Sequence, residues 1–124
     1  MPKYSCITPV LNEEKTIERL LKSLENQTLL PDQVVIVDAG SNDKTIEKIN
    51  QYKKTSKLDI LLILSPVRNL GYQRNLAIEN ARNNILLNAD SGTILDSNYA
   101  ANMIGPFAKY KDIDLVGGVH RITD

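Results

Sequence analysis

The residues best suited to chemistry lie at positions 85–93, which read Ile-Leu-Leu-Asn-Ala-Asp-Ser-Gly-Thr. The apolar run stops at Asn88, and Asp90 follows two positions later, next to Ser91 and Gly92. An unbroken apolar run is typical of a strand buried on both faces, so these polar residues would follow its carboxyl end. A carboxylate there, beside small residues, suits a divalent cation that carries a diphosphate. The same residue types also form ordinary turns, so this stretch alone leaves both interpretations open.

Three further polar side chains could join this site. Asp38 follows the apolar run at 34–37, where its carboxylate could bind a base or ribose or could simply cap the next turn. Arg74 could pair with Asp90, with Asp38 or with a phosphate, or it could be a solvated helix residue. Glu13 could line the same crevice or only complement the dipole of the helix that follows it.

The periodicity of apolar residues predicts the elements that would position these side chains. Strands are predicted at residues 4–8 (closed by Pro9), 34–37, 60–64, 85–87 and 113–116. Helices are predicted from Asn12 as N-cap to about residue 26, at 44–54, at 71–83, and from Asp96 onward with a kink or early end at Gly105-Pro106.

Strands that alternate with helices predict an α/β fold. We expect a mostly parallel sheet with right-handed crossovers and helices on both faces, in a three-layer α/β/α arrangement. The polar segments 8–12, 38–41 and 88–92 then follow strands one, two and four, so they should meet at one edge of the sheet. That edge would form a nucleotide-type crevice.

Composition limits the classes of function. The 124 residues are 42% hydrophobic and carry 15 basic and 15 acidic side chains, which predicts one domain and gives no basic surplus for nucleic acid. No apolar run is long enough to span a bilayer. Cys6 is the single cysteine, so we expect a buried thiol and a cytoplasmic protein, with peripheral contact at the inner membrane face left open. An open sheet edge could drive self-association.

Several common site types are disfavoured. There is no G-x-G-x-x-G after the first strand and no P-loop sequence, which argues against the usual dinucleotide and P-loop sites. His120 is the only histidine, so a histidine-based triad and a zinc site have little support.

With these residues assembled, the chain resembles the family 2 glycosyltransferases, which are inverting enzymes with a GT-A fold, Rossmann-like in its architecture. Residues 7–14 resemble the family's first strand and its Pro-x-x-Asn-Glu turn, and residues 35–45 resemble its V-D-D-G-S-x-D-x-T segment. Residues 71–75 are similar to the glycine followed by A-R-N, and residues 88–90 occupy the place of the D-x-D metal motif. The four stretches occur in order and cover almost the whole chain.

The resemblance implies a donor site for a UDP- or GDP-linked sugar. It would comprise Thr8, Pro9, Asn12, Glu13, Asp38, Gly71, Arg74, Asn88 and Asp90. Asp38 would bind base or ribose, Gly71 and Arg74 would close over the nucleotide, and Asp90 would coordinate Mg²⁺ or Mn²⁺ at the diphosphate. A hydroxyl of a glycan, lipid or protein acceptor, deprotonated by a carboxylate, would then attack the anomeric carbon and invert it.

Three departures from the family pattern qualify this expectation. Ala39 replaces the second acid of V-D-D, and Asn88 replaces the first acid of D-x-D unless Asp90-Ser91-Gly92 is a D-x-G variant. The family's base and acceptor site lie downstream of Asp124, so residues 1–124 are expected to be one donor-binding domain, the N-terminal part of a longer catalytic domain. The alternatives are a non-catalytic module on this fold that binds a nucleotide sugar or a protein and, less well supported, a nucleotidyltransferase.

Overall fold

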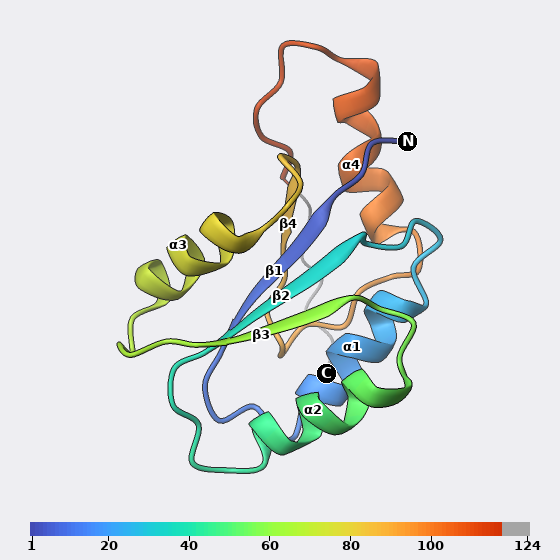
Figure 1. Ribbon diagram of the computed structural model, residues 1–124. Helices are drawn as coiled ribbons and strands as arrows, with labels where there is room; N and C mark the ends of the chain where they lie inside the picture. Colours follow the sequence, from blue (N-terminus) through green and yellow to red (C-terminus); the bar gives the residue numbers. More distant parts are fainter. Residues whose placement is uncertain (118–124) are drawn as a thin grey trace.

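The computed structural model describes residues 1–117, so residues 118–124, including His120, lie outside the described part. Strands and helices alternate along the chain (Figure 1). They are β1 (Ser5–Val10), α1 (Ile17–Glu25), β2 (Gln33–Asp38), α2 (Thr45–Thr55), β3 (Ile60–Leu64), α3 (Leu70–Asn80), β4 (Leu86–Asn88) and α4 (Tyr99–Lys109).

The four strands form one parallel sheet in the order β3-β2-β1-β4. Val10 pairs with Asp38, and Ile7 pairs with Asn88, so the carboxyl ends of β2 and β4 flank that of β1 at the same edge. After β1 the chain adds β2 and β3 on one side and then crosses over to add β4 on the other side, so the point between β1 and β4 is where the strand order reverses. In open α/β sheets such a reversal leaves a crevice in which ligands bind.

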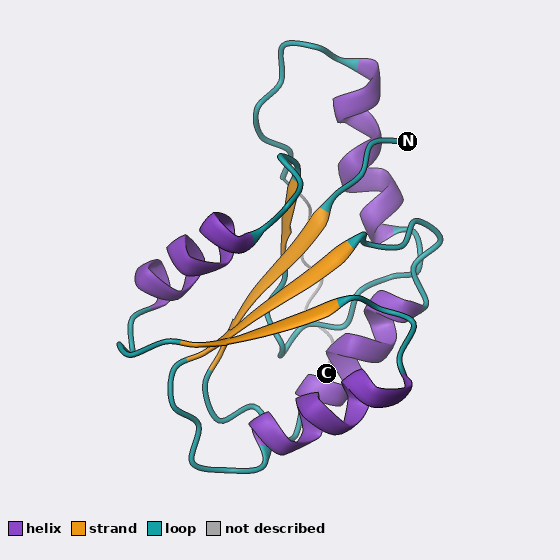
Figure 2. Ribbon diagram, viewed as in Figure 1, coloured by secondary structure: helices purple, strands orange, loops and turns teal. Residues whose placement is uncertain are grey.

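Helices cover both faces of the sheet, as predicted (Figure 2). Cys6, Val34 and Ile36 pack on one face against the apolar sides of α1 and α2. Tyr4 and Leu87, on that same face by strand alternation, pack against α4. The opposite face is covered by α3 and contributes Ile7, Val35 and Val37. Because both faces are covered, every residue of β1 and β2 is buried, and the three-layer α/β/α prediction is confirmed.

β1 continues through Pro9, which was expected to end it. Ser5 donates its N–H to Ile85 O and Ile7 O accepts from Ala89 N, so alternate residues of β1 direct their backbone groups toward β4. Pro9 belongs to this series but lies beyond the end of β4 at Asn88. Its missing N–H therefore costs the sheet no hydrogen bond, which is why a proline is tolerated there.

Other predicted boundaries were also wrong. Asn12 does not cap α1, because it has a positive φ of 53° and the helix begins only at Ile17. α3 ends at Asn80 rather than at residue 83, and α4 continues through Pro106 to Lys109, with the N–H of Tyr110 donating to Pro106 O. Residues 113–116, predicted as a fifth strand, pair with no strand in the described part of the chain.

Candidate functional site

The loops that follow β1 and β2 are fastened to each other. The backbone N–H of Asn12 donates to Ser41 Oγ, and its side-chain Oδ1 accepts from the N–H of Asn42, both at 2.8 Å. The positive φ of Asn12 turns its backbone and side chain toward the second loop, a conformation that asparagine tolerates better than most residues. Glu13 N–H adds a 2.8 Å bond to Thr45 Oγ1. The two strand ends therefore form one connected rim.

The carboxylate of Asp38 holds the turn after β2. Asp38 is fully buried, and it accepts from the N–H groups of Gly40 and Ser41 at 2.8 Å and from Ser41 Oγ at 2.5 Å. Gly40 has a φ of +92°, a conformation that a side chain would strain. Of the two interpretations of Asp38, the capping role is thus the one that the structure displays, and contact with a base or ribose stays a prediction.

Asp43, one turn further along the rim, holds the start of α2. Its carboxylate accepts from the N–H and the hydroxyl of Thr45 at 2.9 and 2.6 Å. Desolvation opposes ionisation of this group, but the hydrogen bonds from Thr45 and from the N–H of Glu14 outweigh it and lower the pKa of Asp43. This lowered pKa favours the carboxylate form of Asp43, which holds the start of α2.

Arg68 is a rim residue that the sequence analysis did not single out. Its Nη2 donates to Gly40 O at 3.0 Å, so the side chain lies against the turn after β2. The segment that carries it is tied to the same strand, because Ser65 N–H donates to Asp38 O at 2.7 Å. The position of this arginine between a strand and the next helix could have marked it as a candidate site residue. Its distance along the chain from the other motifs, however, gave no reason to group it with them.

α3 begins at the carboxyl edge of the sheet. Asn69 caps the helix by accepting from the N–H of Tyr72 at 2.9 Å. Gly71 is exposed at the first turn, and a Cβ on it would approach Asn69 Oδ1 to 3.2 Å, so the glycine keeps the cap compact. Gln73, which sequence reasoning also passed over, is 2% exposed and bonds to two strand carbonyls. Its spacing of four residues from the inward-facing Ala77 was the signal that could have revealed it.

Arg74 and Asp90 meet across the reversal point of the sheet. Arg74 Nη2 lies 3.8 Å from Asp90 Oδ1, with side-chain exposures of 38% and 64%. An open pair at this separation contributes little to stability. Two buried polar atoms of the site have no hydrogen-bond partner in the described structure, Arg74 Nε and Thr8 Oγ1. The structure thus brings the predicted arginine and carboxylate together and leaves them accessible to a ligand.

The other predicted residues lie along the same edge. Asn88 is exposed at the end of β4, Pro9 is buried near the end of β1, and Glu13 is half-buried with its carboxylate accepting from Thr16 Oγ1 at 3.0 Å. All nine candidate residues therefore belong to the loops and ends at the carboxyl edge of the sheet or to the first turns of α3.

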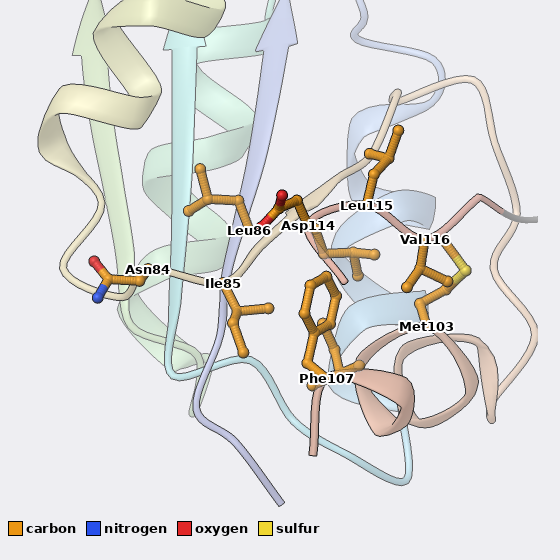
Figure 3. A pocket seen from close by; sticks show the side chains of 10 residues that line it. Asn84, Ile85, Leu86, Met103, Phe107, Asp114, Leu115 and Val116 are labelled. Carbon is orange, nitrogen blue, oxygen red and sulfur yellow. The ribbon is translucent and has the colours of Figure 1, made fainter. Parts of the chain in front are cut away.

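An apolar cavity of about 270 Å³ lies elsewhere, between β4 and α4. Figure 3 shows Phe107 and Met103 on the helix side, with Ile85 and Val116 nearby, while Asn84 points away from them. It is lined by Asn84, Ile85, Leu86, Leu87, Met103, Ile104, Phe107, Asp114, Leu115 and Val116. None of the predicted site residues borders it, so it is separate from the carboxyl-edge site.

The arrangement fits a metal held jointly with a ligand. No three histidine, cysteine or acidic side chains within residues 1–117 come together as a metal site. Mg²⁺, however, is commonly bound through one or two carboxylates together with substrate phosphates and water. An exposed carboxylate such as Asp90 suits that mode of binding, whereas a metal held by protein groups alone is not what these residues provide.

A parallel sheet with a reversal point, and an arginine, a carboxylate and a helix start gathered beside it, are features typical of α/β domains that bind ligands at the carboxyl edge of the sheet. Comparison with known families then gives the family. The model for Glycosyl transferase family 2 matches residues 5–124, and the chain belongs to this family.

Two curated relatives act on related polymers. The chain is 33% identical over 93 residues to the poly(ribitol-phosphate) beta-N-acetylglucosaminyltransferase TarS of Staphylococcus aureus, covering 73% of this chain and 16% of that protein. It is 34% identical over 100 residues to the poly(ribitol-phosphate) beta-glucosyltransferase of Bacillus spizizenii, covering 77% and 16%. The chain therefore spans about a sixth of the length of these relatives.

Solved structures confirm the GT-A fold. TarS residues 1–349 in complex with UDP superimpose with a TM-score of 0.78 at 28% identity, covering 88% of this chain and 33% of that one. A mannosyltransferase from Pyrobaculum calidifontis in complex with GDP-Man and Mn²⁺ gives a TM-score of 0.68 at 27% identity, covering 73% of this chain and 27% of that one.

Among the helices of residues 1–117, none combines the length and apolar character that crossing a bilayer requires.

Proposed function

We propose that this chain is the donor-binding part of a glycosyltransferase that moves a sugar from a nucleoside diphosphate to an acceptor hydroxyl. The observation that carries the proposal is the meeting of Arg74 and Asp90 at the reversal point of a family 2 fold. Structures of TarS with UDP-GlcNAc and of the mannosyltransferase with GDP-Man support a nucleotide-sugar donor.

Arg74 and Asp90 would divide the binding of the diphosphate between them. The Arg74 guanidinium, which has an unpaired Nε–H, can donate to phosphate oxygens. Asp90, with Asn88 beside it, would hold Mg²⁺ or Mn²⁺, and the metal would supply neutralisation of the charge that develops on the leaving diphosphate. At a separation of 3.8 Å the two groups attract each other only weakly, so little free energy would be lost when each binds a ligand instead.

The nucleoside would lie along the connected rim of β1 and β2. Thr8, Pro9, Asn12 and Glu13 line the first strand end, Asp38 supports the turn of the second, and Gly71 stands at the start of α3. Transfer would invert the anomeric carbon, because the acceptor hydroxyl attacks opposite the leaving diphosphate after a carboxylate takes its proton. The acceptor would be a hydroxyl of a glycan, lipid or protein, and the base is left unassigned.

Calorimetric titration tests the donor and the metal together. UDP, GDP, UDP-GlcNAc and GDP-Man are titrated in Mn²⁺, in Mg²⁺ and in EDTA. We expect one nucleotide series to bind only with metal, and Asp90→Asn to weaken that binding at least about tenfold, or about 1.4 kcal/mol. Asp96→Asn, a change at another exposed aspartate, serves as the matched control.

Absence of metal-dependent binding by folded protein would overturn the proposal. Unchanged affinity in Asp90→Asn would remove Asp90 from its metal-binding role. If the protein binds donor and the full-length gene product neither transfers nor hydrolyses the sugar, the non-catalytic nucleotide-sugar module becomes the better account.

A further inference from the structure

Gln73 joins α3 to two neighbouring strands through one amide group. Its Nε2 donates to Val10 O at 3.1 Å and to Val37 O at 2.9 Å, and both bonds are buried. Both N–H donors of the amide are thereby used. Val10 ends β1, and Val37 precedes the last residue of β2, so the amide sits directly beneath the two loops of the rim.

Besides Gln73, α3 contacts the sheet through apolar packing and through Asn80 O, which accepts from Gln33 Nε2 at 3.3 Å. Ala77 is buried and Leu76 is half-buried against Ile7, Val35 and Val37, but such apolar contacts are not directional and resist sliding or rotation less than a hydrogen bond does. Directional hydrogen bonds from Gln73 to two separate strands resist both movements, because neither carbonyl can be reached from a rotated helix. The amide therefore helps to set the rotation of α3 about its own axis, at the end of the helix that carries Arg74.

That rotation decides where Arg74 points. The next residue along a helix is turned by about 100°, so a fixed Gln73 fixes the direction of its neighbour. Arg74 lies on the side toward β4, where its guanidinium meets Asp90. Since side chains extend about 6 Å from a helix axis, a 10° rotation of α3 would displace the guanidinium by about 1 Å. A misplacement of that order is enough to impair an electrostatic contact in a binding site.

We propose that Gln73 is a positioning residue that aims the Arg74 guanidinium at the diphosphate of the donor. Gln73 touches no donor atom in this account and acts through α3. The inference rests on the proposed function for its ligand, but the coupling of Gln73 to Arg74 is a property of the unliganded protein. It adds a buried glutamine to the nine residues predicted for the site.

A double-mutant cycle separates positioning from general stability. Gln73→Met keeps the length of the side chain and removes the amide, and it is made in the wild type and in an Arg74→Ala background. We expect Gln73→Met to weaken UDP or GDP binding, whichever the wild type prefers, about tenfold in the first and less than about twofold in the second. Ile78→Gly, at an exposed position of the same helix, weakens α3 without touching the strand carbonyls and should leave affinity unchanged.

A ligand-free measurement keeps the inference testable by itself. The Arg74 Nε–H signal, assigned through its loss in Arg74→Lys, is recorded by ¹H–¹⁵N NMR. We expect it to be shifted and protected from exchange in the wild type, since Nε is buried, and to move toward the free-arginine position in Gln73→Met. An unmoved signal, or equal affinity losses in the two backgrounds, would overturn the role of Gln73. No nucleotide binding by the wild type, together with a moved signal, would reject the proposed function and support the coupling.

Discussion

Replacing Asp38 by alanine should act mainly by lowering the free energy of unfolding, and any loss of a direct ligand contact should be a smaller effect. The variant removes a buried carboxylate that accepts two backbone N–H bonds and one hydroxyl bond from Gly40 and Ser41. Because the carboxylate closes the turn after β2, these donors lose their partner when the turn keeps its native shape. The loss should therefore appear as a change in folding free energy.

The expected magnitude follows from those three bonds. A hydrogen bond contributes about 1 kcal/mol net, and more when one partner is charged, while water can partly replace the carboxylate at the exposed Gly40. We expect a loss of about 3 kcal/mol. A chain of 124 residues has an unfolding entropy of about 260 cal/mol/K, so the melting temperature should fall by about 12 °C. Asp38→Asn, which keeps one carbonyl oxygen as an acceptor, should lose less.

Urea denaturation followed by circular dichroism measures this loss, and the slope with urea should stay constant. Asp96→Ala is the control, because it removes an exposed aspartate from a loop. A native melting temperature for Asp38→Ala combined with lost nucleotide binding would refute the reasoning. It would mean that the carboxylate serves the base or ribose and that the turn holds without it.

Three further outcomes are expected. Asn12→Ala should lower the free energy of unfolding in urea by about 2 kcal/mol, because it removes the bond from Asn42 N–H and places alanine at a strained positive φ. Asn12→Gly removes the same bond without the strain and should lose about 1 kcal/mol, so equal losses would contradict the role of φ. Burial raises the pKa of the Cys6 thiol from 9.0 to about 12, so the native protein should resist thiol reagents at pH 8. The contribution of the neutral thiol to the free energy of unfolding should be complete below pH 9 and should decline toward pH 12, and this decline should be absent in Cys6→Ala. Asp59→Ala should cost less than about 1 kcal/mol despite the 2.5 Å contact of this carboxylate with Arg82, because the pair is exposed. A loss of about 3 kcal/mol in a thermal melt would show that solvent does not screen the pair.

Much of the fold could be predicted because it depends on hydrophobic periodicity alone. The β-branched run of β2 could only be a doubly buried strand, and strands that alternate with helices permit little besides a parallel sheet. Boundaries were less predictable because they depend on partners. Pro9 remains in β1 since β4 is too short to need its N–H. Residues 113–116, which read Ile-Asp-Leu-Val, form no strand because no strand of the described structure pairs with them.

For the site, the sequence by itself determined which residues share the carboxyl edge, because the direction of each strand dictates where its loop emerges. Only the tertiary structure decided what each side chain does there. It turned Asp38 inward to its own turn, set Asn12 across two loops, and placed Arg74 against Asp90. It also revealed the amide of Gln73 beneath the strand ends. These roles depend on the rotation of a helix and the direction of individual hydrogen bonds, which contacts between distant segments establish and local spacing leaves free.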